Sequence, residues 1–207
     1  MADAPGIRLG PLRPSYPVRT ERLLLRPLTA ADAGALLAYR GRGDVSRYVP
    51  FEPMSRDDIL ERIAGPWART ELTDEGQALT LGAELAGTGE LAGDVVLFWH
   101  SREHAGGELG YVFNPALGGH GYATEAAHAM LRLGFEELGL HRIIARIEER
   151  NEPSVKLARR LGMRQEARLV HNEIFKGEWS TEVDFAILEH EWRAALPSSI
   201  DNGSSGH

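Results

Sequence analysis

Three strand-like segments follow one another with no helix between them, and this order restricts the possible folds more than any other feature. The segments span residues 78–85, 91–99 and 108–113, and a Gly-rich turn over 86–90 joins the first two. A simple doubly wound parallel sheet needs a helix between consecutive strands, so the order excludes that architecture. It predicts a mixed α+β sheet with helices on its faces.

The segments on either side of this meander complete the element order. A strand over 22–26 precedes two helices, whose N-cap signals lie at Thr29 and Ser55, and residues 40–54 between them are expected to form a surface loop. After the meander, the pattern predicts a helix over 122–138, a strand over 142–148, a short helix over 153–161, and strands over 168–175 and 181–188 joined by a hairpin.

Length and charge limit the domain count and the partners. The 207 residues suit one domain over 18–195, with a Pro-rich arm at 1–17 and a Ser/Gly-rich disordered tail at 196–207, either native or left from expression cloning. The chain carries 30 acidic and 23 basic side chains, a net charge of −7, which argues against nucleic-acid or anionic-membrane partners. No run of eighteen apolar residues or secretory signal is found, so a cytoplasmic location is expected.

The chain contains no cysteine. This excludes disulfides, cysteine-bound zinc and a thiol nucleophile, so no acyl-cysteine can form. The segment from His100 to His104 spells an inverted zinc-protease pattern, which needs a helix. Because a strand precedes the segment and glycines follow it, we expect a loop there and no metal site.

A glycine-rich turn is the strongest candidate site. Gly118, Gly119 and Gly121 surround His120 directly before the predicted helix. Glycines allow positive φ, so successive N–H groups can converge on an anion at the positive end of the helix. The alternative is a tight strand–helix turn that needs these glycines for its geometry and binds no ligand. The nucleoside-triphosphate loop is excluded because Tyr122-Ala123 follow where Lys-Ser/Thr is required, and the dinucleotide fingerprint fits poorly.

Several blocks in register resemble the GNAT superfamily of acyl-CoA N-acyltransferases. They are Glu-Leu-Gly-Tyr from Glu108, the glycine loop up to Ala126, Asn151-x-x-Ser154, and Arg-Arg-Leu-Gly-Met from Arg159. Thr20–Arg26 and the Gly177…Asp184…Glu191-Trp192 ending are similar to the RimJ/RimL-like branch, whose named members acetylate ribosomal-protein N-termini. The resemblance implies a three-layer α/β (α+β) GNAT fold with a mixed, mostly antiparallel sheet of six to seven strands and helices on both faces.

The resemblance also implies how acetyl-CoA is held, without a metal. Backbone N–H groups within Gly118, Gly119, His120, Gly121, Tyr122 and Ala123 would bind the pyrophosphate, and Thr124 would add a hydroxyl. Backbone groups of Tyr111, Val112 and Phe113 and the side chain of Asn151 would bind the pantetheine arm. The sequence departs from the family pattern at Gly118 and His120, where basic or amide side chains are common. Arg159 and Arg160 are our choices near the 3′-phosphate, within a segment of local positive charge.

The same resemblance suggests the catalytic groups. Glu108 would be the general base or the carboxylate that binds the ammonium, and an N–H near Val112 or Phe113 would meet the oxyanion. Many family members carry a thiol-protonating Tyr where this chain has Ala158, so Ser154 is expected to serve the leaving thiol. Without the resemblance, Asn151 and Ser154 would be interpreted only as residues that begin a helix.

The acceptor is expected to be a primary amine, in the order protein N-terminal α-amine, lysine, small amine. Tyr48, Phe51 and Trp67 would shape its site, and a succinyl donor would find Arg40, Arg42 and Arg47 nearby. The alternatives are a non-catalytic acyl-CoA sensor on the same fold and, more distantly, a nicotinamide-dinucleotide enzyme. The chain is expected to be a monomer or a homodimer.

Overall fold

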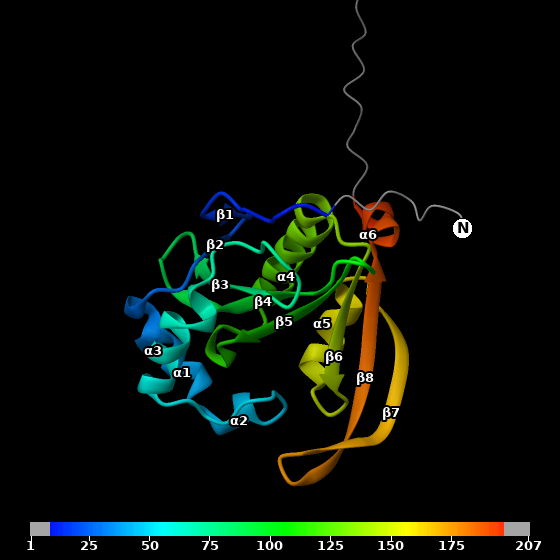
Figure 1. The fold of residues 1–207 in the computed structure, drawn as a ribbon. Helices are drawn as coiled ribbons and strands as arrows, with labels where there is room; N and C mark the ends of the chain where they lie inside the picture. The colour runs from blue at the N-terminus through cyan, green and yellow to red at the C-terminus, as the bar shows by residue number, and fades with distance from the viewer. Residues whose placement is uncertain (1–8, 197–207) are drawn as a thin grey trace, which may run out of the picture.

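The computed structural model describes residues 9–196, which form one mixed sheet with helices on both faces (Figure 1). The strands are β1 (Val18–Arg19), β2 (Leu23–Arg26), β3 (Ala78–Leu85), β4 (Leu91–Ser101), β5 (Gly106–Phe113), β6 (Arg142–Glu148), β7 (Arg164–Phe175) and β8 (Glu178–Leu188). Their order is β1-β2-β3-β4-β5-β6-β8-β7, and β5–β6 is the one parallel pair that the described residues form. The expected mixed, mostly antiparallel α+β sheet is confirmed. The sheet has eight strands rather than six to seven, because the two-residue β1 is too short to show an alternating pattern.

The helices divide between the two faces of the sheet (Figure 1). They are α1 (Ala33–Arg40), α2 (Gly43–Ser46), α3 (Arg56–Ala64), α4 (Tyr122–Arg132), α5 (Glu152–Arg160) and α6 (Glu189–Ala195). The first core packs α4, α5 and α6 against one face, and the second packs α1 and α3 against the other. Helix α2 corrects the expected loop over 40–54, and α6 was also not predicted, because neither is long enough to show a helical period.

The predicted long helix over 122–138 changes its winding near the end. After Arg132 the segment η4 (Leu133–Leu138) takes a π-helical turn and ends at Gly139, whose φ is 85°. Three short 3-10 turns complete the chain: η1 (Ala30–Asp32), η2 (Pro66–Ala68) and η3 (Pro115–Leu117). None of the described helices has the length and apolar character needed to span a membrane.

The two ends of the chain extend beyond the described residues. Of the predicted arm, residues 1–8 lie outside them, and so do residues 197–207 of the predicted tail. The rest of the arm packs on the domain. Leu12 is buried, and its N–H and carbonyl bond to Leu72 at 2.8 and 3.0 Å.

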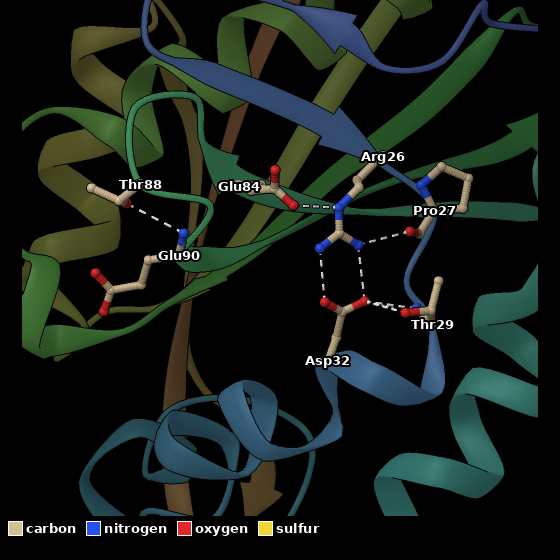
Figure 2. A network of polar contacts seen from close by, with 7 residues as sticks. All are labelled: Arg26, Pro27, Thr29, Asp32, Glu84, Thr88 and Glu90. Atoms are coloured by element: carbon tan, nitrogen blue, oxygen red, sulfur yellow. Dashed lines mark hydrogen bonds and ion pairs between the residues drawn. The ribbon is translucent and has the colours of Figure 1, made fainter.

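An arginine-centred network fixes the second helical layer to the sheet (Figure 2). Arg26 on β2 donates to Glu84 on β3 at 2.6 Å and, through both terminal nitrogens, to Asp32 at 2.8 and 2.9 Å. Asp32 also accepts the backbone N–H of Thr29 at 2.7 Å, as the capping pattern predicted. The start of α1 is therefore tied directly to two strands.

The parallel pair β5–β6 separates after three residues. Its register runs Gly106↔Arg142, Gly107↔Ile143 and Glu108↔Ile144, although β5 continues to Phe113 and β6 to Glu148. The β6-facing edge of β5 beyond Glu108 therefore has no partner strand among the described residues. We call this opening the splay, and Glu108 lies at its base.

Candidate functional site

The glycine loop forms an open nest of N–H groups at the start of α4. Gly119 and Gly121 take φ values of 81° and 82°, in the left-handed region that favours glycine. Within the described chain, the N–H groups of residues 119–124 donate to no other residue. A Cβ added at Gly119 would meet nothing within 4 Å. We call Gly119–Thr124 the N–H nest, and its geometry fits a pyrophosphate.

Side chains from the connection between β1 and β2 hold this nest in place. Arg22 donates to the His120 carbonyl at 2.9 Å and to the Glu125 carboxylate at 2.7 Å. Thr20 donates to the same carboxylate at 2.5 Å. Burial opposes ionisation of Glu125, but the hydrogen bonds from Thr20 and Arg22 outweigh it and lower its pKa. Sequence reasoning did not select Arg22 and Glu125 as site residues, because no local pattern pairs positions so far apart.

The residues predicted to contact the pantetheine arm lie on β5, which borders the splay, and at the start of α5. The Tyr111 hydroxyl on β5 donates to the Ser154 carbonyl on α5 at 3.2 Å, and burial raises the pKa of Tyr111 to about 12. Asn151 caps α5 by accepting the Ser154 N–H at 3.4 Å. Val112 packs on the second core and Phe113 on the first. The structure thus brings Tyr111, Asn151 and Ser154 together.

The basic segment after His141 is mostly neutralised. Its ion pairs are Arg142–Glu166, Arg146–Glu108, Arg150–Glu148, Arg164–Glu166 and Arg168–Glu149. Arg159 and Arg160, in the last turn of α5, make no ion pair with another described residue, and Arg159 lies 6.0 Å from the Phe185 ring centre. The positive charge left over is therefore concentrated at these two positions.

Glu108 sits in a polar cluster at the base of the splay. Its Oε2 atom accepts both Arg146 Nη2 at 3.0 Å and Arg146 Nε at 3.2 Å, and lies 2.7 Å from His100 Nε2. The Glu108 side chain is 15% exposed. Its other oxygen, Oε1, has no hydrogen-bond partner in the part of the chain that the structure describes. That oxygen is free to accept a proton or to bind a cation.

Two further carboxylates lie on the same face of the sheet, on β8. Asp184 is paired in register with Arg146, and its buried Oδ1 atom has no hydrogen-bond partner within residues 9–196. Burial and the neighbouring charge of Asp184 raise the pKa of Glu182. This face therefore presents unneutralised negative charge.

The suspected zinc pattern is not helical. His100 belongs to β4, and His104 lies in the turn that follows. Across residues 9–196, no group of three His, Cys, Asp or Glu side chains is placed to hold a metal ion.

The three aromatic residues predicted at the acceptor site lie in different surroundings. Phe51 and Trp67 sandwich the Arg40 guanidinium, each ring centre 4.7 Å from it, and Trp67 is buried in the second core. Tyr48 instead lines a surface cavity, with Arg47 at 5.2 Å from its ring centre. Of the three, Tyr48 and Phe51 each line a surface cavity, whereas Trp67 is buried.

The arginines expected near a longer acyl chain also differ in burial and in ion pairing. Arg40 is buried and bonds to Asp94 through two nitrogens, and the Tyr39 hydroxyl donates to the same carboxylate at 2.6 Å. Arg42 pairs with Asp44 at 2.8 Å, whereas Arg47 makes no ion pair with another described residue. Of the three, Arg47 alone keeps a free charge.

Comparisons with known proteins agree with this fold. The model of the GNAT acetyltransferase domain matches residues 22–164. The protein named uncharacterized N-acetyltransferase YnaD, from Bacillus subtilis (strain 168), is 35% identical over 176 residues, covering 84% of this chain and 98% of that protein. A GNAT-family acetyltransferase from Bacillus anthracis has a crystal structure with a TM-score of 0.74 and 34% identity, covering 83% of this chain and 98% of that one. Spermidine N(1)-acetyltransferase of Escherichia coli (strain K12) is 29% identical over 106 residues, covering 51% of this chain and 57% of that protein.

Proposed function

The chain belongs to the GNAT acetyltransferase family, and we propose that it transfers an acetyl group from acetyl-CoA to a primary amine, with protein N-terminal α-amines preferred. One observation carries the proposal. The N–H nest follows β5 after one short turn over residues 114–118, and the same strand carries Glu108 at the base of the splay, so one strand and its turn connect a phosphate-binding end to a carboxylate.

The donor is held mainly by backbone atoms. The N–H nest receives the pyrophosphate, the free edge of β5 from Tyr111 to Phe113 bonds to the pantetheine arm, and Asn151 contacts that arm from α5. Bound acetyl-CoA supplies an acetyl group activated as a thioester. Arg159 and Arg160 provide charge for the 3′-phosphate, and a succinyl donor would place its carboxylate near Arg47.

The acceptor must lose protons before and during transfer. An N-terminal α-amine has a pKa of about 8 and a lysine about 10.4, so the former needs only modest help at neutral pH. The free Oε1 of Glu108 takes one proton from the ammonium or orients it for loss to water. As the new C–N bond forms and the C–S bond breaks, the second ammonium proton passes to the thiol sulfur, which Ser154 assists by hydrogen bonding.

A small amine is the second candidate acceptor. It is supported by the relative named for spermidine and by the unneutralised carboxylates Glu182 and Asp184, which attract cations. The α-amine is favoured because it requires less deprotonation and because the sequence resembles the RimJ/RimL-like branch.

Thermal unfolding with acetyl-CoA, CoA, succinyl-CoA and NADH tests the donor. A ligand at 100 times its Kd should add about 2.7 kcal/mol, so we expect clear shifts with acetyl-CoA and CoA and none with NADH. Mass spectrometry of N-terminal peptides, N-terminally blocked lysine peptides and spermidine, each incubated with acetyl-CoA, then identifies the acceptor. No shift with any CoA would overturn the donor site. Acetylation of spermidine alone would replace the preferred acceptor.

A further inference from the structure

Two segments far apart in the chain meet beyond the open end of the splay. The loop around α2 and the tip of the β7–β8 hairpin lie side by side (Figure 1), and the Lys176 ammonium joins them. It donates to the Ser46 carbonyl at 2.8 Å and the Phe51 carbonyl at 2.7 Å, with the Glu52 carboxylate 3.4 Å away. This one side chain therefore connects the loop around α2 (residues 43–53), which we call the α2 loop, to the last hairpin.

The hairpin turn itself gives no local reason for a lysine at this position. Lys176 and Gly177 take φ values of 51° and 84°, so both central residues are left-handed. Turns of this kind favour Asn-Gly, because a longer side chain disfavours positive φ. The contacts of the Lys176 ammonium with the Ser46 and Phe51 carbonyls explain why a lysine occupies this turn.

The contact closes one side of a cavity of about 270 Å³. Its wall includes Tyr48 from the loop, Arg150 after β6, and Phe175 and Lys176 from the hairpin. Glu108 is paired with Ile144 at the base of the splay, and Arg150 is six residues further along that strand and its turn. At about 3.3 Å per residue of extended strand, Arg150 lies at most roughly 20 Å from Ile144, because β6 ends at Glu148, so an extended acceptor with its amine at Glu108 would reach the cavity.

The opposite side of the loop is already fixed. Phe51 stacks on Arg40, and the Met54 N–H donates to the Arg40 carbonyl at 3.0 Å. Because Arg40 is buried against Asp94, this attachment is part of the core. The loop thus has a core-bound side and a side held by the partly exposed Lys176, and only the second can be released without disturbing the core.

We propose that Lys176 is a positioning residue that sets acceptor specificity by holding the α2 loop against the β7–β8 hairpin. It acts through the walls of the cavity and touches no reacting atom. The proposal rests on the proposed acetyl transfer to an amine. Without the ammonium, the loop and the hairpin separate and extended acceptors lose their binding surface.

The test compares K176M with K176R and with K156M, which changes the other lysine of the chain. Lys156 is 66% exposed on α5 and pairs with Glu152. We expect K176M to raise the KM for an extended N-terminal peptide about tenfold, the expected loss for charged hydrogen bonds, with acetyl-CoA KM unchanged. K176R keeps a cation with several N–H donors and should restore most of the peptide KM. K156M should match the wild type.

Hydrogen exchange of residues 43–53 provides a readout independent of activity. Faster exchange in K176M than in K176R, with equal melting temperatures, is expected. Peptide KM within twofold of wild type in K176M, or an equal change in acetyl-CoA KM, would overturn the proposal while the acetyl transfer stands. A wild-type protein that acetylates no amine would overturn the proposed function and the specificity role together, and unchanged exchange would also refute the loop contact.

Discussion

The donor and acceptor ends of the candidate site are built in different ways. The N–H nest uses backbone groups of consecutive residues, directed by two left-handed glycines and the start of α4. The acceptor end, which we define as Tyr48, Glu108, Arg146, Glu182 and Lys176, uses side chains from segments separated by up to 134 residues. The first depends on local backbone geometry and the second on the whole topology. Substitutions should therefore separate donor binding from acceptor binding and turnover.

The strongest test of this separation is E108Q. The amide keeps the shape of the side chain but cannot take a proton, so we expect kcat to fall by about 10²–10⁴-fold. The acetyl-CoA Kd, measured by thermal shift, should stay the same because the N–H nest is untouched. E103Q is the control, because Glu103 is an exposed residue of the turn between β4 and β5. Loss of acetyl-CoA binding in E108Q would show that the two ends are not independent.

A second large effect is expected when the buried Arg40–Asp94 pair, which anchors the α2 loop, is broken. Arg40 and Asp94 are 7% and 1% exposed, so R40M leaves a buried carboxylate without its partner. We expect the free energy of unfolding to fall by about 3–5 kcal/mol in urea titrations at neutral pH. R42M is the control, because Arg42 and Asp44 are 48% and 61% exposed and solvent screens such a pair, so its loss should hardly change stability. Equal losses in the two variants would mean that the Arg40 sandwich does not hold the loop.

This contrast also explains what the sequence could predict. The nest was located because three glycines before a helix are a local pattern. The strand order followed from alternation and turn residues in the same way. Arg22, which holds the nest from 98 residues away, belongs to no such pattern and was not selected. Glu108 was selected through the family resemblance, whereas its partners His100 and Arg146 depend on strand register, which no local pattern specifies.

Most of the acceptor end, beyond Tyr48 and Glu108, could not be predicted for the same reason. Trp67 was expected near the acceptor because it ends the segment that follows the 40–54 loop, but it packs against Arg40 in the second core. Lys176 was read only as part of a hairpin, since its contact with Phe51 depends on how the last hairpin meets the first loop. Strands β7 and β8 also begin earlier than predicted, at Arg164 and Glu178, because charged residues at their starts hide the alternation.

The nest gives the next prediction, which affects the donor alone. G119V forces a β-branched residue into the left-handed region and places its side chain in the open space of the nest. We expect acetyl-CoA binding to weaken at least about tenfold, with kcat at saturation unchanged. G89V is the matched control, because Gly89 has a φ of 75° and equally open surroundings in the β3–β4 turn. Both variants should lose similar stability, so a binding loss in G119V alone assigns the effect to the nest.

The smallest effect concerns the charge that the acceptor end carries. Burial and the charge of Asp184 raise the pKa of Glu182 above its ordinary value, so the folded state holds the proton more tightly than the unfolded state. The ionised carboxylate therefore lowers stability at neutral pH, and this cost vanishes as the pH falls below the ordinary glutamate pKa. We expect E182Q to raise Tm slightly at pH 7, to leave it unchanged at pH 4, and to raise the KM of cationic acceptors.

Thermal unfolding at both pH values, with E90Q in the exposed β3–β4 turn as control, separates the two roles of Glu182. A lower Tm for E182Q at pH 7 would mean that the carboxylate makes a stabilising contact, contrary to its raised pKa. A higher Tm with unchanged acceptor KM would mean that the charge lies outside the acceptor end. If both expected changes occur, the charge of Glu182 lowers the stability of the fold and strengthens the binding of cationic acceptors. The N–H nest needs no such compromise, because its partial positive charge comes from the backbone itself.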